Sequence, residues 1–354
     1  MRLTREQRRL RDDGTPAQRK AMQILLALSH LSEAERLVPV TSAHVSGASY
    51  KMIGDPGLEF LEDFARDARA RAYGSMGVRP SFTCTPYLVG ARPAFGEHVA
   101  WAESNAVCFA NSVLGARTNR EGGPSALAAA IVGATPDHGL HKDEGRRPTV
   151  RVNVTTKPHG LDFSLIGLVA GQRVGDGLPF FRGFHGSEED LKWLGASLAS
   201  TGACAMFHLE DVTPEARRAR TAGLPSITIS RRDLVEAQRS FTDGTKPDVI
   251  ALGSPQLSGQ ELWGVADRVR RKPPRIPVWV FTSRAVRDEN PEPVAAIESH
   301  GGRVLADTCL EVTLLEHQFG TVATPSGKAA YYLPTLCKQK VILDELDALL
   351  ERYG

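Results

Sequence analysis

The feature that most constrains the fold is a regular alternation of short apolar strands and helices in the last third of the chain. The predicted strands cover 247–252, 276–282 and 302–306, and the predicted helices between them cover 259–271 and 291–300. An amphipathic helix predicted over 339–352 closes the chain. Strands joined through helices pair in parallel, so this order predicts the α/β class with mainly parallel sheets.

The rest of the chain carries the same two patterns less regularly. Predicted helices cover 15–29, 31–36, 57–74, 97–114 and 124–133, and a further helix is capped by Ser187. Predicted strands cover 37–45, 78–85, 161–170, 203–209 and 225–230. The character of the sequence changes near residues 150 and 240. We therefore expect three α/β domains, at 1–150, 151–240 and 241–354.

Composition excludes several classes of protein. The chain has 354 residues and a net charge of +2, from 43 basic and 41 acidic residues, so no basic excess points to nucleic acid. No apolar run is long enough for a membrane-spanning helix. The basic start carries two aspartates and lacks a small-residue cleavage site, so we interpret it as an N-terminal helix pair of a cytoplasmic protein rather than a signal peptide.

Five clusters of polar residues follow predicted strands. They are TSAHVSGAS, TCTPY, GSPQLS, TSR and DTC. In α/β proteins the loops after the carboxyl ends of strands usually build the functional site. The clusters therefore predict one site shared between domains.

Two of the five cysteines lie at such strand ends. Cys84 and Cys309 are placed where thiolates can hold iron, or where buried thiols simply fill space. Cys108, Cys204 and Cys337 lie in apolar segments and are expected in the core. The wide spacing of the cysteines does not indicate a disulfide framework.

The segment 96–127 is unusually polar for a helix in an apolar run. Buried polar groups must be hydrogen-bonded, so Asn105 and Asn111 predict a helix that faces a polar cavity. The segment Arg117–Thr118–Asn119–Arg120 then leads into a Gly-Gly-Pro-Ser helix start. That pattern suits either a carboxylate or phosphate site or a structural turn.

Two further motifs leave alternatives open. Ser326 and Lys328 in Thr-Pro-Ser-Gly-Lys suit a contact to a substrate carboxylate or a helix cap, and lack the spacing of a nucleotide-binding loop. His44 can be an acid, a base or a core histidine.

These segments together resemble the large, catalytic part of the aconitase X family. The resemblance is carried by VTSAHVSGAS, FTCTPYLVG, the block GEHVAWAESNAVCFANSVLGARTNREGGPSALAAAIVG, MFHLEDVTPEA, ALGSPQLS, FTSR, ADTC and TPSGKAAYYLP. It runs from about residue 38 to residue 334 in the family's order.

The resemblance implies a hydro-lyase with an aconitase-like fold. Three α/β domains with mainly parallel sheets would surround a central cleft, and a small swivelling domain would complete the site. Because the chain ends at Gly354, after the family's last large-subunit helix, the resemblance implies that this domain is a separate small subunit in a heterodimer.

The implied cofactor is an iron–sulfur cluster, [2Fe–2S] or [4Fe–4S], or a mononuclear iron. The family's cysteine motifs match this chain at Cys84 and Cys309, whereas Ser254 stands where a third cysteine is expected. A serine hydroxyl binds iron much more weakly than a thiolate, so a smaller centre is as plausible as a full cluster.

The resemblance also implies the roles of the site residues. Loss of water from a hydroxy acid needs a Lewis acid, a base and a clamp on the carboxylate. Candidates for catalysis are His44, Ser46, Asn105, Asn111 and Lys328. Candidates for substrate binding are Gly47, Ser49, Arg117, Thr118, Asn119, Arg120 and Ser326. By analogy with aconitase, a serine of the small subunit could supply the base.

Three functions are compatible with this sequence. The altered cysteine motif and the arginine-rich composition favour a dehydratase of cis-3-hydroxy-L-proline that yields a pyrroline-2-carboxylate. The alternative is a dehydratase of mevalonate 5-phosphate, which would need additional cationic contacts. The third is a non-catalytic binding relative that has lost a metal ligand at Ser254.

Overall fold

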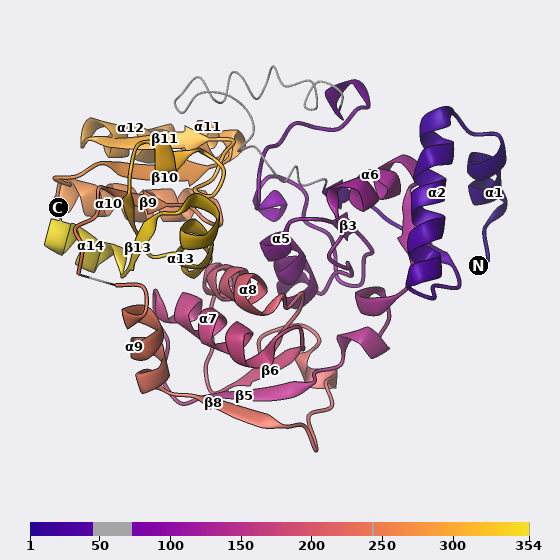
Figure 1. The fold of residues 1–354 in the computed structure, drawn as a ribbon, viewed down its shortest axis with the longest axis horizontal. Coiled ribbons are helices and arrows are strands. Elements are labelled where there is room, and N and C mark those ends of the chain that lie inside the picture. The colour runs from indigo at the N-terminus through magenta and orange to yellow at the C-terminus, as the bar shows by residue number, and fades with distance from the viewer. Residues whose placement is uncertain (45–72, 243, 354) are drawn as a thin grey trace.

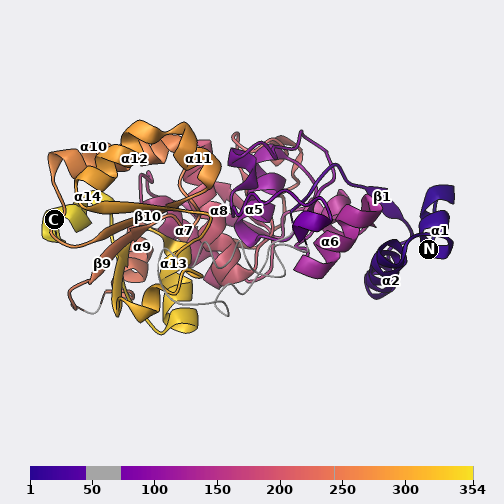
Figure 2. The same ribbon diagram turned by 90° about the horizontal axis from the view of Figure 1, so that it is seen from above.

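A computed structural model describes residues 1–44, 73–242 and 244–353. It contains two larger parallel sheets and two small two-stranded sheets within these ranges, which confirms the α/β class. Figures 1 and 2 place the N-terminal helix pair and the C-terminus at opposite ends of the molecule.

The C-terminal sheet has five parallel strands in the order β11-β10-β9-β12-β13. The strands are β9 (Val249–Leu252), β10 (Val278–Thr282), β11 (Gly302–Ala306), β12 (Thr321–Thr324) and β13 (Lys340–Leu343). The helices are α10 (Gly259–Arg271), α11 (Arg284–Glu289), α12 (Pro291–Ser299), α13 (Gly327–Tyr332) and α14 (Leu346–Tyr353). The alternation expected over 247–306 is confirmed. The single helix expected over 339–352 is wrong, because the apolar run Val341–Leu343 is a buried strand that pairs with β12.

Residues of this sheet alternate between two hydrophobic cores. Ile250 and Val280 pack under α10 and α12, whereas Ala251 and Phe281 face a core shared with α7, α8 and α13. Because successive side chains of a strand point to opposite faces, both faces of the sheet are covered.

The second parallel sheet has four strands in the order β7-β6-β5-β8. The strands are β5 (Val150–Val154), β6 (Pro179–Arg182), β7 (His208–Leu209) and β8 (Ser226–Ile229), and the helices are α7 (Asp162–Val174), α8 (Glu188–Gly202) and α9 (Arg231–Arg239). Ser187 caps α8 in a capping box, as expected. The strand expected over 161–170 is wrong. That segment lies in α7, which is buried on every side, and a short apolar run does not distinguish a buried helix from a strand.

The N-terminal part is built from short elements. The helices are α1 (Arg5–Asp12), α2 (Pro16–Leu31), α5 (Ser104–Phe109) and α6 (Gly123–Val132), and the strands are β1 (Leu37–Pro39), β2 (Ala43–His44), β3 (Ala100–Trp101) and β4 (Ala134–Pro136). Short 3-10 turns lie at Pro86–Leu88, Gly139–His141, Glu144–Arg146, Ala216–Arg218 and Leu315–His317, and π turns lie at Ala110–Leu114 and Leu333–Cys337.

Several sequence predictions fail in this part. The expected N-terminal helix pair is present, but at α1 and α2, because Ser32 ends α2 and no helix covers 31–36. The stretch 78–85 is an irregular loop rather than a strand. The helix expected from residue 97 begins only at Ser104, after β3. The helix expected over 57–74 lies largely outside the described residues.

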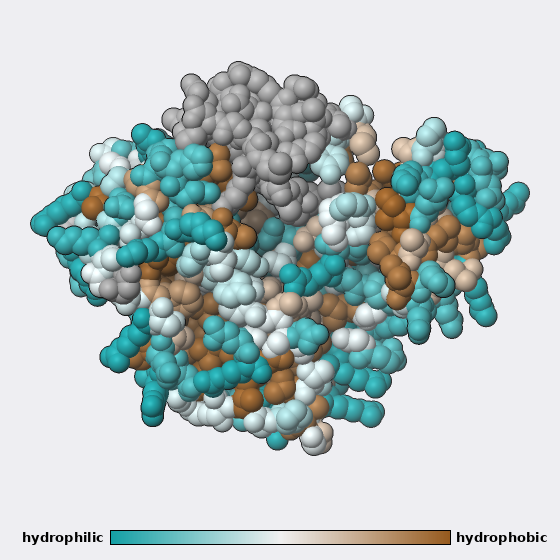
Figure 3. Space-filling view, viewed as in Figure 1, coloured by the Kyte–Doolittle hydropathy of each residue, from teal (hydrophilic) through white to brown (hydrophobic). Residues whose placement is uncertain are grey.

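The surface of the helix pair follows its amphipathic pattern. Met22 and Leu25 of α2 are fully buried in a small core with Ala128 of α6. Figure 3 shows apolar residues gathered where α2 faces α6, and hydrophilic residues on the outer side of the pair. No helix in the described ranges is both long and apolar enough to cross a membrane.

Helices α7 and α8 join the parts of the molecule. They pack against each other on the four-stranded sheet, and α8 also contacts α5 and α13 (Figure 1). Glycines allow this close approach, because a Cβ at Gly167 of α7 would meet the Leu194 carbonyl oxygen and lie 2.8 Å from the Ser197 Cβ.

The substitution Gly167→Ala is expected to destabilise the fold by about 1–3 kcal/mol through overpacking of two helix backbones. Chemical denaturation followed by circular dichroism measures the change. The matched control is Gly74→Ala, where an added Cβ meets none of the described residues within 4 Å beyond its own chain neighbours and helix backbone. Equal unfolding midpoints for the two variants would contradict this explanation of the helix contact.

Candidate active site

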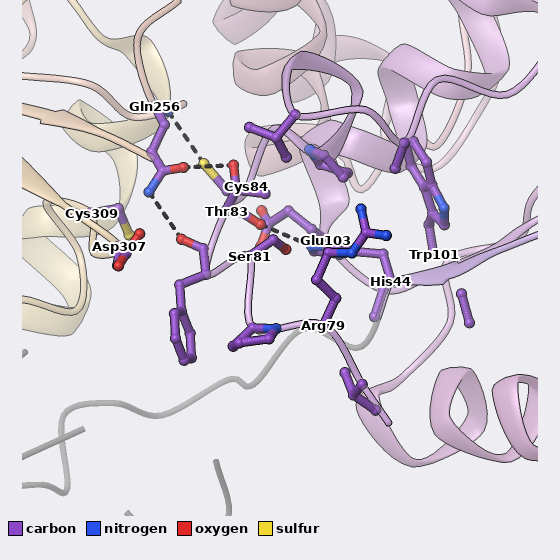
Figure 4. Close-up of a pocket in the computed structure, with 18 of the residues that line it drawn as sticks. His44, Arg79, Ser81, Thr83, Cys84, Trp101, Glu103, Gln256, Asp307 and Cys309 are labelled. Atoms are coloured by element: carbon purple, nitrogen blue, oxygen red, sulfur yellow. Dashed lines mark hydrogen bonds between the residues drawn. The ribbon is translucent and has the colours of Figure 1, made fainter. Parts of the chain in front are cut away.

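A cavity of about 810 Å³ lies where the first and last thirds of the chain meet. Four of the five polar clusters contribute to its wall, together with α6 and α13. The lining side chains with chemical function are His44, Arg79, Thr83, Cys84, Glu103, Gln256, Asp307, Thr308, Cys309, Glu311 and Lys328. Figure 4 shows Cys84 and Cys309 on the side near Gln256, and His44, Arg79 and Glu103 on the opposite side.

The two cysteines expected at strand ends both reach this cavity. Cys309 follows β11, and Cys84 lies in the loop before Pro86. The Cys84 sulfur accepts a hydrogen bond of 3.2 Å from the backbone N–H of Gln256. Burial raises the pKa of Cys84 to about 11, although the nearby Lys328 opposes the shift. Burial and the Glu311 carboxylate raise the pKa of Cys309 well above its usual value. Both groups are therefore neutral thiols near pH 7.

Lys328 bridges the two walls of the cavity. Its ammonium donates to Glu103 Oε1 at 3.0 Å and to Asn105 Oδ1 at 2.9 Å. Burial lowers the pKa of Lys328, but Glu103 and the other acidic neighbours outweigh it and raise the pKa well above the usual value. Asn105 in turn donates to the Cys84 carbonyl oxygen at 2.7 Å, so Lys328 and Cys84 are held by one amide.

His44 has a defined tautomer. Its Nε2 lies 2.8 Å from the Thr83 carbonyl oxygen, which can only accept, so Nε2 carries the proton. Its Nδ1 is buried and has no hydrogen-bond partner among the described residues. Burial lowers the pKa of His44, and the negative charge of Glu103 only partly offsets this, so the ring is neutral near pH 7. A neutral imidazole with a free nitrogen is able to accept a proton.

Gln256 organises the thiol side and was not among the expected site residues. Its side chain donates to the backbone oxygens of Thr308, at 2.9 Å, and Phe82, at 3.3 Å, and accepts from Thr83 Oγ1 at 2.7 Å. Gln256 thus connects its own loop to the loop that holds Cys84 and to the segment that holds Cys309. Its place in GSPQLS, directly after a strand, is the sequence signal that could have found it.

Arg79 and Glu311 are two further lining residues that sequence reasoning missed. Arg79 makes no ion pair or side-chain hydrogen bond with the described part of the chain. Glu311 is only 6% exposed and follows the DTC motif by two positions. Nothing in their local sequence marks them, because single charged residues in loops are usually solvated.

The segment 117–120 does not line this cavity. Arg117 donates to the His141 carbonyl oxygen and pairs with Asp143 at a separate polar surface pocket. Thr118 is fully buried, and its hydroxyl accepts from Trp101 N–H. Asn119 accepts from Leu140 N–H, and Arg120 donates to the Ala203 carbonyl oxygen. These contacts are those of a structural turn, one of the two interpretations that the sequence left open.

Asn111 and Ser326 are also engaged within the protein and do not line the cavity. Asn111 is fully buried, donates to the Thr118 and Ala205 carbonyl oxygens, and accepts from Thr118 N–H and Arg146 Nη1. Ser326 caps α13, and its hydroxyl donates to the Ser254 carbonyl oxygen. The structure thus places Ser326 as a helix cap, the second of its two expected roles.

Ser254 lies behind the cavity wall rather than on it. It is fully buried, and its hydroxyl donates to Glu311 Oε1. Cys108, Cys204 and Cys337 are buried, as expected for core thiols. Ser46, Gly47 and Ser49 lie outside the described residues. Within the described ranges no three His, Cys, Asp or Glu side chains converge as a ready-made metal site.

Comparison with known families covers nearly the whole chain. Models of the aconitase X first, second and third domains match residues 1–72 and 65–144, 148–239, and 247–353, respectively. The chain belongs to the aconitase X family. This confirms the resemblance carried by the motifs.

Named relatives in the aconitase X family are dehydratases. The phosphomevalonate dehydratase large subunits of Methanothermobacter thermautotrophicus and Thermococcus kodakarensis are 42% and 41% identical, over 92% and 95% of each chain. The cis-3-hydroxy-L-proline dehydratase of Pseudomonas aeruginosa is 32% identical over 92% of this chain and 65% of its own length. The crystal structure of Thermococcus kodakaraensis aconitase X, in its holo-form, matches all of both chains with a TM-score of 0.91 and 39% identity.

These comparisons confirm the hydro-lyase class and the three-domain aconitase X fold. They do not favour the first expectation on substrate, because the large subunits that act on phosphomevalonate are more similar than the hydroxyproline enzymes. The name "large subunit" of these relatives is consistent with a small-subunit partner.

The substitution Asn111→Ala is expected to lower stability, by about 1–3 kcal/mol for each buried partner left unsatisfied. The measurement is the unfolding midpoint in denaturant, with Asn153→Ala as the control, because that amide bonds only to Ser226 at an exposed site. Normal stability combined with lost dehydratase activity would instead support a catalytic role for Asn111.

Proposed function

We propose that this chain is the large subunit of a dehydratase of mevalonate 5-phosphate, and that a small subunit completes its site. The observation that carries the proposal is one cavity that holds two thiols, a buried lysine and an arginine unpaired among the described residues. The higher identity to phosphomevalonate dehydratase large subunits than to hydroxyproline dehydratases supports this choice of substrate.

Membership in an aconitase-like family suggests an iron-containing centre. The donors fit such a centre, because Cys84 and Cys309 face one cavity and the buried carboxylate of Glu311 has an oxygen without a partner among the described residues. We propose that Cys84 and Cys309 hold the iron. When bound, it would serve as the Lewis acid that polarises the hydroxyl group to be lost.

The phosphate of the substrate needs a cation that is not already neutralised. The ammonium of Lys328 is already paired with Glu103. The carboxylate of Asp307, another lining residue, is paired with Arg284 and so does not neutralise Arg79. Among the described lining residues Arg79 therefore carries the positive charge left for an anion. Guanidinium groups bind phosphate with two parallel hydrogen bonds, so Arg79 is proposed as the phosphate contact.

The proton on carbon is proposed to go to His44. Thr83 fixes the proton on Nε2, so Nδ1 is the atom that accepts. The positive charge that then forms on the ring is stabilised by Glu103, the charged group that acts on His44 most strongly after burial. Lys328 and Asn105 keep Glu103 and the Cys84 loop in place beside it.

The test of substrate is an assay of the chain with its small subunit, loaded with iron under anaerobic conditions. Turnover of mevalonate 5-phosphate and not of cis-3-hydroxy-L-proline, followed by proton NMR, is expected. Arg79→Ala should raise KM for the phosphorylated substrate roughly 10- to 100-fold, the effect of losing a charged hydrogen bond. Arg79→Lys should recover part of it.

The matched control is Arg92→Ala, because Arg92 is paired with Glu188 on the surface and does not line the cavity. Turnover of cis-3-hydroxy-L-proline alone would overturn the proposed substrate. Turnover of neither compound would favour a non-catalytic binding relative.

Replacing His44 by Gln is expected to reduce kcat about 10²- to 10⁴-fold, the usual contribution of a general base. Because burial lowers the pKa of His44 below its ordinary value of 6.5, the base form persists to lower pH. The acidic limb of the kcat/KM profile should therefore lie below pH 6.5 and disappear in the variant. His138→Gln, outside the cavity, is the control. An unchanged profile in His44→Gln would place the base on the small subunit instead.

A further inference from the structure

Glu311 is a buried carboxylate with an incomplete environment. One oxygen accepts from the Ser254 hydroxyl, and Oε2 has no hydrogen-bond partner among the described residues. No lysine, arginine or histidine of the described ranges forms an ion pair with it. A buried carboxylate oxygen without a hydrogen bond is costly unless another partner satisfies it.

Two thiols line the same cavity as Glu311. Cys309 lies two positions before it in the chain, and Cys84 comes from the loop before Pro86. Lys328 is the nearby cation, and its ammonium is already bonded to Glu103 and Asn105. Lys328 is therefore engaged elsewhere, and two thiols and a carboxylate line the cavity together.

A bound metal cation would give Glu311 Oε2 the partner that the described residues do not supply. We propose that Glu311 is the third protein ligand of the iron centre and that Ser254 is a positioning residue for it. This inference rests on the proposed iron centre at Cys84 and Cys309. Oxygen and sulfur donors together suit iron, and a carboxylate is a far better ligand than a neutral serine hydroxyl.

The positions of the two residues support this division of roles. Glu311 lines the cavity, whereas Ser254 is fully buried behind it. The Ser254 hydroxyl holds Oε1, which leaves Oε2 as the oxygen available to an ion. The described residues hold no ready-made group of three such donors, so iron binding would require these side chains to move closer together. A hydrogen-bonded partner behind a ligating carboxylate is the arrangement that orients metal ligands in proteins.

The experiment is anaerobic reconstitution of the full chain with Fe²⁺ and sulfide. Iron and sulfide per chain, the absorption spectrum and the electron paramagnetic resonance spectrum are the readouts. Glu311→Gln keeps the shape and removes the charge, and is expected to weaken iron binding at least tenfold. The matched control is Glu316→Gln, in the same loop but outside the cavity lining, which should bind iron like the wild type.

A second variant makes the test independent of how well Glu311→Gln folds. Glu311→Cys puts a thiol in the place of the proposed ligand, so it should bind iron and add sulfur-to-iron charge-transfer absorption. An unchanged spectrum in folded Glu311→Cys, or full iron binding by folded Glu311→Gln, overturns the role of Glu311.

The variant Cys84→Ser distinguishes an error in the role of Glu311 from an error in the proposed iron centre. If Cys84→Ser loses iron while Glu311→Gln retains it with the wild-type spectrum, the centre stands and Glu311 is not its ligand. If the wild type binds no iron at all, the proposed centre is wrong and the role of Glu311 falls with it.

Discussion

The candidate site depends on the burial of one positive charge. Lys328 comes from α13 in the C-terminal part, and its partners Glu103 and Asn105 come from the start of α5. A buried ammonium without such partners would be strongly destabilising, so the two parts of the chain must meet there. Because Asn105 also bonds to the Cys84 carbonyl oxygen, the same constraint fixes where the first thiol stands.

A second set of polar contacts supports the site without reaching it. Asn111 and Arg146 are buried and joined to each other, and Arg146 pairs with Glu215 at 2.6 Å. The turn 117–120 bonds to surrounding backbone groups in the same way. Burying so many polar groups is tolerable only because each has a partner. This explains why the richest stretch of the sequence contributes Asn105 and Glu103 to the active-site network, while Asn111 and Arg117 hold the scaffold.

The fold was predictable where local pattern and burial agree. The strands and helices of 247–306 are short, alternating and flanked by caps, and the structure has them close to their predicted bounds. The pattern failed for α7, because a helix buried on every side has no polar face to reveal its period. It failed again at 78–85, where apolar and polar residues alternate like a strand but Thr83 and Phe82 bond to Gln256 instead of to a neighbouring strand.

The sequence by itself determined the fold class, the family and the two thiols that meet at the cavity, because motifs and periodicity are local properties. The tertiary structure alone decided which polar residues share that cavity. Arg79 and Glu311 carry no local signal, and they enter the site only because segments distant in sequence converge there. Arg117 and Asn111 carry a strong signal, but their side chains bond to backbone groups and to the side chains of Asp143 and Arg146. Whether a polar side chain serves chemistry or the scaffold is set by which partners folding brings within hydrogen-bonding distance.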